Sequence, residues 1–196
     1  FAAEVSGLLE IARTQAIRTA APYATGEVDG RSYILLSHLP LAVHGDWQQA
    51  GVELATLHAN LSDQGYGYGK TTYCGPTPLN NSWRENWSDF FVEQRLEPLV
   101  RELASQGDVF TSADRVLHAC SKALKDHQPD ASLLHGDLWS GNIGFIPDSR
   151  GSLPVIYDPA CYYGDAEADL AMTELFGRFP DAFYKGYQSV RKIEEE

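Results

Sequence analysis

The pattern of apolar and polar positions predicts two helices and a hairpin in the first third of the chain. Apolar residues recur at helical spacing over 1–14 and again over 46–61. Between them, 17–23 and 31–36 are rich in β-forming residues and flank the turn-forming segment 26–30. We therefore expect a helix, a hairpin and a second helix in that order.

The rest of the chain predicts more helices and two short strands. The helices are expected at 82–103, 111–127, 167–176 and 182–190. The segment from Thr111 to Asp114 has the form of a capping box for the second of these, and Pro129 follows its end. Two apolar runs, 131–134 and 153–157, have the length of strands.

Three polar side chains interrupt the two strand-like runs. Asp137 and Asn142 lie in a Gly-containing loop after the first run, and Asp158 ends the second. Two antiparallel strands would bring all three to one end of a hairpin. Phosphoryl transfer from a nucleotide needs such a set, since an aspartate must orient the attacking hydroxyl while an amide oxygen and a second carboxylate hold Mg²⁺. Asp137 is therefore the predicted base, and Asn142 and Asp158 are the predicted Mg²⁺ ligands beside ATP.

A simpler interpretation of the same residues stays open. His135 to Asp137 would then form an ordinary turn, and Asp158 would cap the end of a strand. The two interpretations differ in whether the three polar side chains face one another.

Charge and cysteine content narrow the classes of partner. The 196 residues carry a formal net charge of −12 at a pI near 4.8, which argues against nucleic acid because phosphate contacts need a basic face. The acidity would favour a cationic substrate, although acidity also promotes solubility. Cys74, Cys120 and Cys161 are widely spaced and include no CxxC pair, so we expect reduced thiols rather than a disulfide framework or structural zinc.

Membrane insertion and secretion find no support in the pattern. The sequence has no run of eighteen apolar residues, and its first residues lack the basic-then-apolar order of a signal peptide. A cytoplasmic location is expected by default, with one or two domains.

The motif H-x-D-x-x-x-x-N, followed by a strand that ends in Asp, resembles the catalytic set of kinases. Gly136 stands where protein kinases carry an Arg, which argues against control by activation-loop phosphorylation. Asp158-Pro159-Ala160 replaces Asp-Phe-Gly, and only ten residues separate Asp158 from Asp169, too few for a long peptide-positioning loop. Four segments resemble the sequence motifs of the fructosamine/ketosamine kinase family, which belongs to the aminoglycoside phosphotransferase and choline kinase type. They are 134–142, 154–165, 167–172 and 176–177.

This resemblance implies an α+β, protein-kinase-like (aminoglycoside phosphotransferase-like) fold. Residues 1–41 would be part of a small β-rich N-terminal lobe, and 42–196 a large, mainly helical C-terminal lobe with a catalytic β-hairpin. In this family a Gly-rich loop and a strand lysine lie upstream of the first helix, so the chain is expected to be a piece of a longer kinase that binds ATP poorly by itself.

The resemblance also implies nucleotide contacts in the first forty residues. Glu4 would be the helix residue that pairs with the ATP-binding lysine, and the backbone of Ser37 and Leu39 would hold adenine as the hinge between lobes. The alternatives are a solvated helix residue for Glu4 and a plain strand end for the hinge.

Further roles follow from the resemblance for residues around the catalytic loop. Trp139 would stack on the acceptor's sugar or anchor the loop, and Asp165 would face a substrate amine or cap the helix that follows. His135 is a further candidate for the substrate site. Asp169 would brace the catalytic loop through backbone N–H groups, whereas His58 is expected to be a packed or capping histidine.

The implied activity is ATP-dependent phosphorylation of a fructosamine or ribulosamine at the sugar 3-hydroxyl, a deglycation step. Two alternatives remain: a kinase of another amine-bearing small molecule, such as an aminoglycoside or choline, and a non-catalytic binding module without a nucleotide lobe. The particular ketosamine, its attachment to protein and the oligomeric state stay open.

Overall fold

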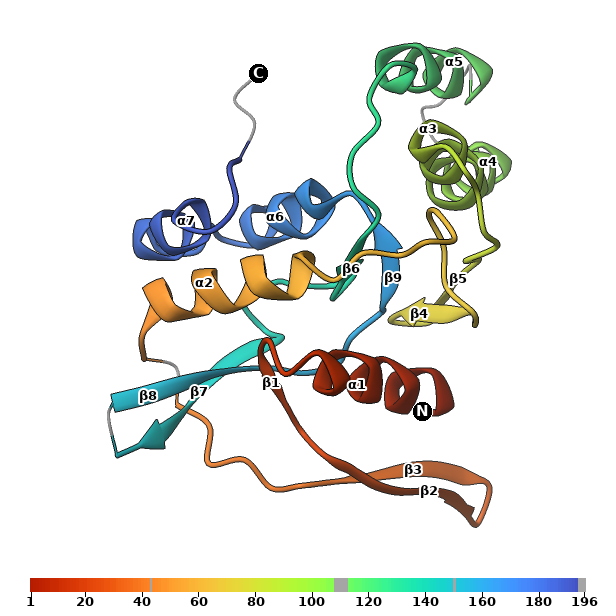
Figure 1. The fold of residues 1–196 in the computed structure, drawn as a ribbon. Helices are drawn as coiled ribbons and strands as arrows, with labels where there is room; N and C mark the ends of the chain where they lie inside the picture. The colour runs from red at the N-terminus through yellow and green to blue at the C-terminus, as the bar shows by residue number, and fades with distance from the viewer. Residues whose placement is uncertain (43, 108–112, 150, 194–196) are drawn as a thin grey trace.

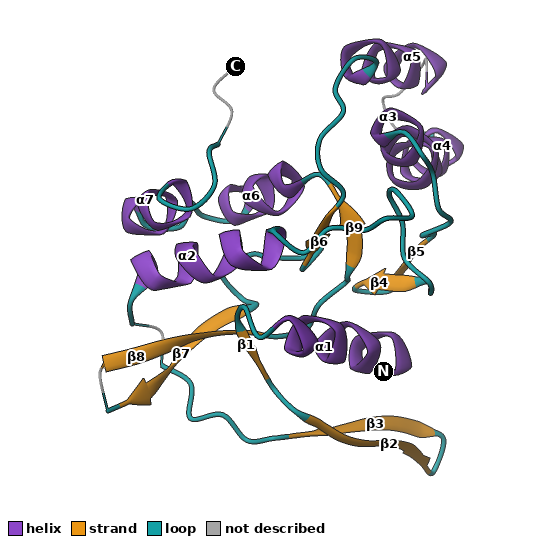
Figure 2. Ribbon diagram, viewed as in Figure 1, coloured by secondary structure: helices purple, strands orange, loops and turns teal. Residues whose placement is uncertain are grey.

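The computed structural model describes residues 1–42, 44–107, 113–149 and 151–193 and has a mixed α+β architecture (Figures 1 and 2). Its helices are α1 (Ala2–Thr14), α2 (Trp47–His58), α3 (Trp87–Phe91), the π-helix η1 (Val92–Leu96), α4 (Glu97–Ser105), α5 (Ala113–Leu124), α6 (Ala166–Leu175) and α7 (Asp181–Gln188). Its strands are β1 (Arg18–Thr19), β2 (Pro22–Val28), β3 (Arg31–Leu36), β4 (Thr72–Cys74), β5 (Thr77–Leu79), β6 (Ser132–Leu134), β7 (Ile143–Asp148), β8 (Gly151–Ile156) and β9 (Tyr162–Gly164).

The N-terminal segment forms the predicted helix and hairpin. Helix α1 buries Leu8 and Ile11 completely and ends at Thr14, because the C-cap residue Gln15 has a left-handed backbone that stops the helix. Strands β2 and β3 pair antiparallel around Asp29 and Gly30, both at positive φ as a tight hairpin turn requires. In Figure 1 this hairpin extends below α1, away from most of the helices. The predicted helix and the presence of a hairpin are confirmed. The expected first strand at 17–23 is wrong, because the hairpin strand is Pro22–Val28 and Arg18–Thr19 pairs with β8 instead.

The strands around the catalytic loop pair differently from the sequence expectation. The runs at 131–134 and 153–157 were expected to be antiparallel partners, and this pairing is wrong. Strand β6 pairs with β9, whereas β8 pairs antiparallel with β7 and parallel with β1. The cause is β7, which begins directly after Asn142 and takes the edge of β8. The polar residues still converge, because Asn142 precedes β7 and Asp158 follows β8 at the same end of that hairpin.

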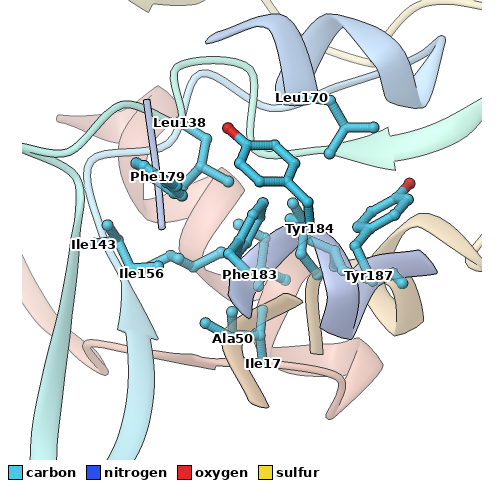
Figure 3. Close-up of a cluster of buried hydrophobic side chains, with 14 of the residues drawn as sticks. Ile17, Ala50, Leu138, Ile143, Ile156, Leu170, Phe179, Phe183, Tyr184 and Tyr187 are labelled. Carbon is cyan, nitrogen blue, oxygen red and sulfur yellow. The ribbon is translucent and has the colours of Figure 1, made fainter. Parts of the chain in front are cut away.

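The main hydrophobic core lies between α2, α7 and the β7–β8 hairpin (Figure 3). Leu54, Phe145, Ile156 and Phe183 are essentially fully buried in it. Helices α2 and α7 can approach closely because Gly51 has no Cβ. A Cβ at this position would collide with the backbone of Phe183. This core forms one side of the scaffold beneath the catalytic loop.

A helical subdomain formed by α3, η1, α4 and α5 lies to one side of the core, at the upper right of Figure 1. The single helix expected at 82–103 begins instead at Trp87 and contains the π-turn η1. Helix α5 ends at Leu124, three residues before the expected end. The expected capping residues Thr111 and Ser112 lie outside the described residues. Within the described part of the chain, every helix is too short or too polar to cross a membrane.

Candidate active site

The loop between β6 and β7 holds Asp137 and Asn142 face to face. The Asn142 side-chain amide donates to the Asp137 backbone carbonyl at 2.8 Å and to its carboxylate Oδ2 at 3.2 Å. The Asn142 N–H donates to the carbonyl of Trp139 at 2.9 Å, which closes the loop. With its nitrogen engaged by Asp137, the Asn142 amide turns its oxygen away from that carboxylate.

Asp158 reaches the same site from the end of β8. Its backbone lies in the left-handed region, with φ of 56°, which turns the chain sharply after the strand. The Ala160 N–H donates to the His135 carbonyl at 2.8 Å and so ties this turn to the catalytic loop. The sharp turn and this bond place the exposed Asp158 side chain beside the loop that carries Asp137.

Carboxylates crowd this site. Burial raises the pKa of Asp137, and the charge of Asp158 adds to that effect. Burial likewise raises the pKa of Glu4, with a further contribution from Asp158, so α1 directs a third carboxylate toward the same region. Like charges held together in this way favour a bound cation, because the cation relieves their repulsion.

The donor set fits Mg²⁺ better than a transition metal. A carboxylate from Asp158 and an amide oxygen from Asn142 are hard oxygen donors, and Mg²⁺ typically takes one or two carboxylates and completes its shell with water and phosphate. Among the described residues, no group of three or more His, Cys, Asp or Glu side chains could hold a metal ion. The two predicted ligands therefore suit an ion that is held partly by nucleotide phosphates.

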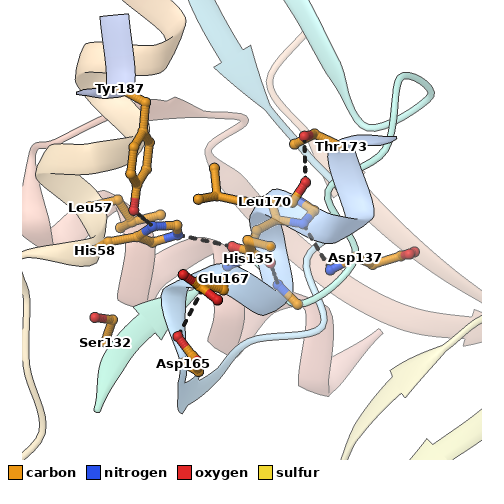
Figure 4. A network of polar contacts seen from close by, with 12 residues as sticks. Leu57, His58, Ser132, His135, Asp137, Asp165, Glu167, Leu170, Thr173 and Tyr187 are labelled. Atoms are coloured by element: carbon orange, nitrogen blue, oxygen red, sulfur yellow. Dashed lines mark hydrogen bonds and ion pairs between the residues drawn. The ribbon is translucent and has the colours of Figure 1, made fainter. Parts of the chain in front are cut away.

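Asp169 braces the catalytic loop as part of a polar network that includes His58, His135 and Tyr187, all three labelled in Figure 4. Its two carboxylate oxygens accept the backbone N–H groups of His135 at 2.7 Å and Gly136 at 2.8 Å. His58 approaches one of these oxygens at 3.2 Å and contacts the Tyr187 hydroxyl at 2.8 Å. The structure confirms the predicted packed position of His58 and the backbone contacts expected of Asp169.

This bracing keeps Asp169 ionised. Burial by itself would raise the pKa of Asp169, but the hydrogen bond and charge of His58, the nearby His135 and the Gly136 N–H outweigh it and lower the pKa. A buried carboxylate satisfied by donors on several sides is a rigid support, so the loop that carries Asp137 is fixed at its base.

His135 lies beneath the loop rather than on its open side. The side chain is fully buried, with Nε2 at 3.0 Å from the Tyr157 carbonyl and Nδ1 at 3.3 Å from the Asp137 N–H. Burial lowers the pKa of His135, which favours the neutral ring that these two contacts require. Its predicted contact with substrate stays a prediction.

Trp139 stands on the accessible side of the loop. Its side chain is 36% exposed, and its ring meets Phe176 edge to face with centroids 5.6 Å apart. Phe176 itself is 62% exposed, so the two rings form an exposed apolar surface. Trp139 follows Asp137 closely in the sequence, in the same loop. Sequence reasoning placed Phe176 only within a family motif, because helix periodicity does not reveal that the ring stands next to Trp139.

Asp165 lies at the start of helix α6. It accepts the Glu167 N–H at 3.0 Å as the N-cap of α6 and contacts His127 Nε2 at 2.7 Å. The predicted cap is confirmed, and the structure does not bring Asp165 together with Asp137. Its proposed contact with a substrate amine stays a prediction.

The hinge residues lie at the end of β3, apart from the catalytic loop. The Ser37 N–H donates to the Ala21 carbonyl at 2.8 Å, and the Ser37 hydroxyl accepts the Ala21 N–H at 2.9 Å. This exchange fixes the end of the hairpin, after which the chain passes Leu39 and reaches Ala42, which bridges to Phe145 on β7. The predicted adenine contacts of Ser37 and Leu39 stay predictions.

Sequence reasoning missed Cys74 as a neighbour of the catalytic loop. The residue ends β4, and its thiol contacts the Asp137 carboxylate. Burial raises the pKa of Cys74, and the charges of Asp137 and Asp158 add to the effect. An isolated cysteine in a turn-rich stretch gives no sequence signal for this contact, since it depends on how β4 packs.

The chain matches known proteins along its whole length. A family model described as fructosamine kinase matches residues 1–196. A Synechocystis protein named a probable ketoamine kinase is 41% identical over 196 residues, and the Escherichia coli probable ketoamine kinase YniA is 37% identical over 196 residues. These matches cover 99% and 98% of this chain but only 65% and 67% of the two relatives.

Solved structures agree with the sequence matches. A provisionally named fructosamine-3-kinase from Haemophilus somnus superposes with a TM-score of 0.92 at 31% identity, covering 99% of this chain and 65% of that one. A second, from Thermobifida fusca, gives a TM-score of 0.80 at 30% identity and covers 100% and 67%. The fold is therefore protein-kinase-like, as expected, and the chain spans about two thirds of the length of its relatives. The chain belongs to the fructosamine kinase family.

Proposed function

We propose that this chain is the catalytic part of an ATP-dependent kinase that phosphorylates the sugar hydroxyl of a ketosamine. The observation that carries the proposal is the convergence of Asp137, Asn142 and Asp158 at one end of the β7–β8 hairpin. Membership of the fructosamine kinase family supports it.

The chain's own residues would contribute positioning and charge. Asp137 would accept or orient the proton of the attacking hydroxyl, held in place by the Asn142 amide and the Asp169 brace. Asn142 and Asp158 would hold Mg²⁺. When bound, this ion neutralises charge on the phosphates. Glu4 and the backbone of Ser37 and Leu39 would serve the nucleotide.

The acceptor in this proposal is a fructosamine or ribulosamine, phosphorylated at the 3-hydroxyl as a deglycation step in the cytoplasm. Two relatives are named probable ketoamine kinases. The exposed Trp139 ring, on the loop that carries Asp137, and the Phe176 ring that it contacts would offer a sugar an apolar face. Phosphorylation of another amine-bearing small molecule and a purely binding role are the alternatives that the experiment must separate.

The test uses the full-length gene product, ATP and a panel of acceptors. Fructosyl-lysine and ribulosyl-lysine, free and in peptides, are compared with an aminoglycoside and choline, and Asp137→Asn is the control. We expect ATP-dependent phosphorylation of a ketosamine that disappears in the variant, with the phosphate located by NMR. Preference for the aminoglycoside or choline would overturn the acceptor, and binding of ATP without transfer to any acceptor would leave only a nucleotide-binding module.

A further inference from the structure

Arg95 belongs to the helical subdomain, yet its guanidinium contacts the segment that follows Asp158. It is presented by the π-turn η1, a rare geometry that is frequent at functional positions. The guanidinium carbon lies 4.2 Å from the ring centroid of Tyr162 on β9 and 4.6 Å from that of Phe90 on α3. The arginine is therefore clamped between the subdomain and the strand just beyond the predicted metal ligand.

A chain of hydrogen bonds leads from Arg95 toward the same segment by a second route. Its Nη2 donates to Asn81 Oδ1 at 2.5 Å, and Asn81 Nδ2 donates to Thr72 Oγ1 at 2.9 Å. The Thr72 hydroxyl donates to the Ala160 carbonyl at 3.4 Å. Each group donates to the next in one direction, because the guanidinium has no acceptor and the Asn81 oxygen is taken by it. Asn81, Thr72 and Ala160 are all buried.

This path of hydrogen bonds ends at Ala160, where two loops of the candidate active site meet. The Ala160 N–H already donates to His135, and a Cβ on Gly136 would collide with the Ala160 carbonyl. Ala160 is thus the residue at which the loop carrying Asp137 touches the turn carrying Asp158. A donor aimed at the Ala160 carbonyl fixes both loops relative to each other.

Packing stability does not account for a charged residue at this position. Burial lowers the pKa of Arg95, and its Nε is buried without a hydrogen-bond partner among the described residues. The acceptors of its Nη groups are carbonyls and an amide, not a carboxylate that would compensate the charge. An apolar residue of similar length would fill the space between Tyr162 and Phe90 without that desolvation cost.

We propose that Arg95 is a positioning residue for phosphoryl transfer, acting through Asn81 and Thr72 on Ala160 and through its stacking on Tyr162. The inference rests on the proposed function. In this role Arg95 acts on the geometry of the site: it fixes the distance between Asp137 and Asp158 and links the helical subdomain to that distance. Phosphoryl transfer is sensitive to such a displacement, since misplacement by about 1 Å can cost on the order of a hundredfold in rate.

The test compares Arg95→Met with Arg84→Met in the full-length gene product. Methionine keeps the apolar contact with Tyr162 and Phe90 but cannot donate to Asn81. Arg84 is a matched control, since it lies in the same region and pairs with Glu93 on the surface at 2.9 Å. At saturating Mg²⁺ we expect kcat to fall about tenfold or more in Arg95→Met, with KM for ATP and ketosamine nearly unchanged, and no change in Arg84→Met.

Thr72→Val provides a second, independent variant because it removes the hydroxyl that accepts from Asn81 and donates to Ala160, while it keeps the side-chain shape. It should lower kcat in the same direction, and the double variant with Arg95→Met should lose less than the product of the two single losses. If Arg95→Met does not fold, Thr72→Val alone carries the comparison. An unchanged kcat, a loss confined to KM, or independent losses in the double variant would overturn the inference.

A readout without acceptor separates this inference from the proposed function. The Mg²⁺ concentration for half-maximal ATP binding should rise several-fold in Arg95→Met and stay unchanged in Arg84→Met, because Asp158 is displaced only in the former. Equal midpoints would overturn the positioning role even if ketosamines are not the acceptors. If the wild type transfers no phosphate but the midpoint still shifts, the acceptor assignment fails and the positioning role stands. Absence of Mg²⁺-dependent ATP binding in the wild type would overturn both.

Discussion

The catalytic loop and the β2–β3 hairpin differ in their surroundings. The loop region is bordered by fully buried residues such as Leu133 and Ile156 and braced by Asp169. The hairpin leaves Tyr23 68% exposed and Leu35 54% exposed. The residues proposed for phosphoryl transfer are thus held by a core that this chain supplies, whereas the predicted adenine contacts depend on a hairpin with little packing. The stability of the two regions should differ accordingly.

The largest expected difference is in core packing. Phe183→Ala removes a fully buried ring that contacts Phe179 and Tyr184, and we expect a loss of about 3–5 kcal/mol in unfolding free energy. Tyr23→Ala on the hairpin should change it by less than about 0.5 kcal/mol. Urea unfolding of both variants measures the contrast. Equal losses would mean that the hairpin is packed as tightly as the core.

Removing the charge of Asp169 should have the next largest effect. In Asp169→Asn one oxygen becomes an amide nitrogen, so a buried N–H of His135 or Gly136 loses its acceptor, at a cost of about 2–4 kcal/mol. The control Asp181→Asn breaks an exposed pair with Arg178 and should cost at most about 1 kcal/mol. The denaturant midpoints of the two variants measure these two losses in unfolding free energy. A small effect at Asp169 would show that the loop does not need its brace.

Two glycines of positive φ make a matched pair across the two regions. Gly136 has φ of 83°, and a Cβ there would collide with the Ala160 carbonyl, while Gly30 has φ of 73° with open space around it. Gly30→Ala should lower the unfolding free energy by about 1–2 kcal/mol, because alanine is strained at this positive φ. Gly136→Ala should cost more and also lower phosphate transfer, because the two loops must separate. Equal costs, measured by thermal unfolding, would contradict the close contact at Ala160.

The smallest effect is a pH dependence. Because the pKa of Asp169 is lower in the folded protein than its ordinary value near 3.8, this residue contributes stability that is fully present above that value and is lost as pH falls through the folded pKa. The difference in unfolding free energy between wild type and Asp169→Asn should therefore shrink as the pH is lowered from about 5 toward 2. A difference independent of pH would mean that Asp169 gains nothing from ionisation.

The sequence predicted local elements well and singled out Asp137 and Asn142, which the structure brings together, while their catalytic roles stay predictions. Periodicity located α1 and α2, and the His-Gly-Asp motif identified Asp137, whose contact with Asn142 follows from their short separation. The predicted roles of Glu4, Ser37 and Leu39 remain predictions.

Contacts between distant segments were less accessible from the sequence. The pairing of β6 with β9 was missed because strand partners are chosen by the whole core rather than by the pattern of one strand. The contact of Cys74 with Asp137 and the path from Arg95 to Ala160 also join distant segments, and neither residue carries a local motif for its role. The surroundings of Arg95 are set by a π-turn that helix periodicity does not reveal.

The most direct test of the account is the rate of the chemical step in the full-length gene product. Single-turnover transfer of phosphate from ATP to a ketosamine isolates that step from product release. We expect Asp137→Asn to slow it by about 10²–10⁴-fold while leaving ATP affinity nearly unchanged. Transfer at the wild-type rate in this variant would contradict the assignment of Asp137 as the base and, with it, the role of the site that Asn142, Asp158 and Asp169 hold in place.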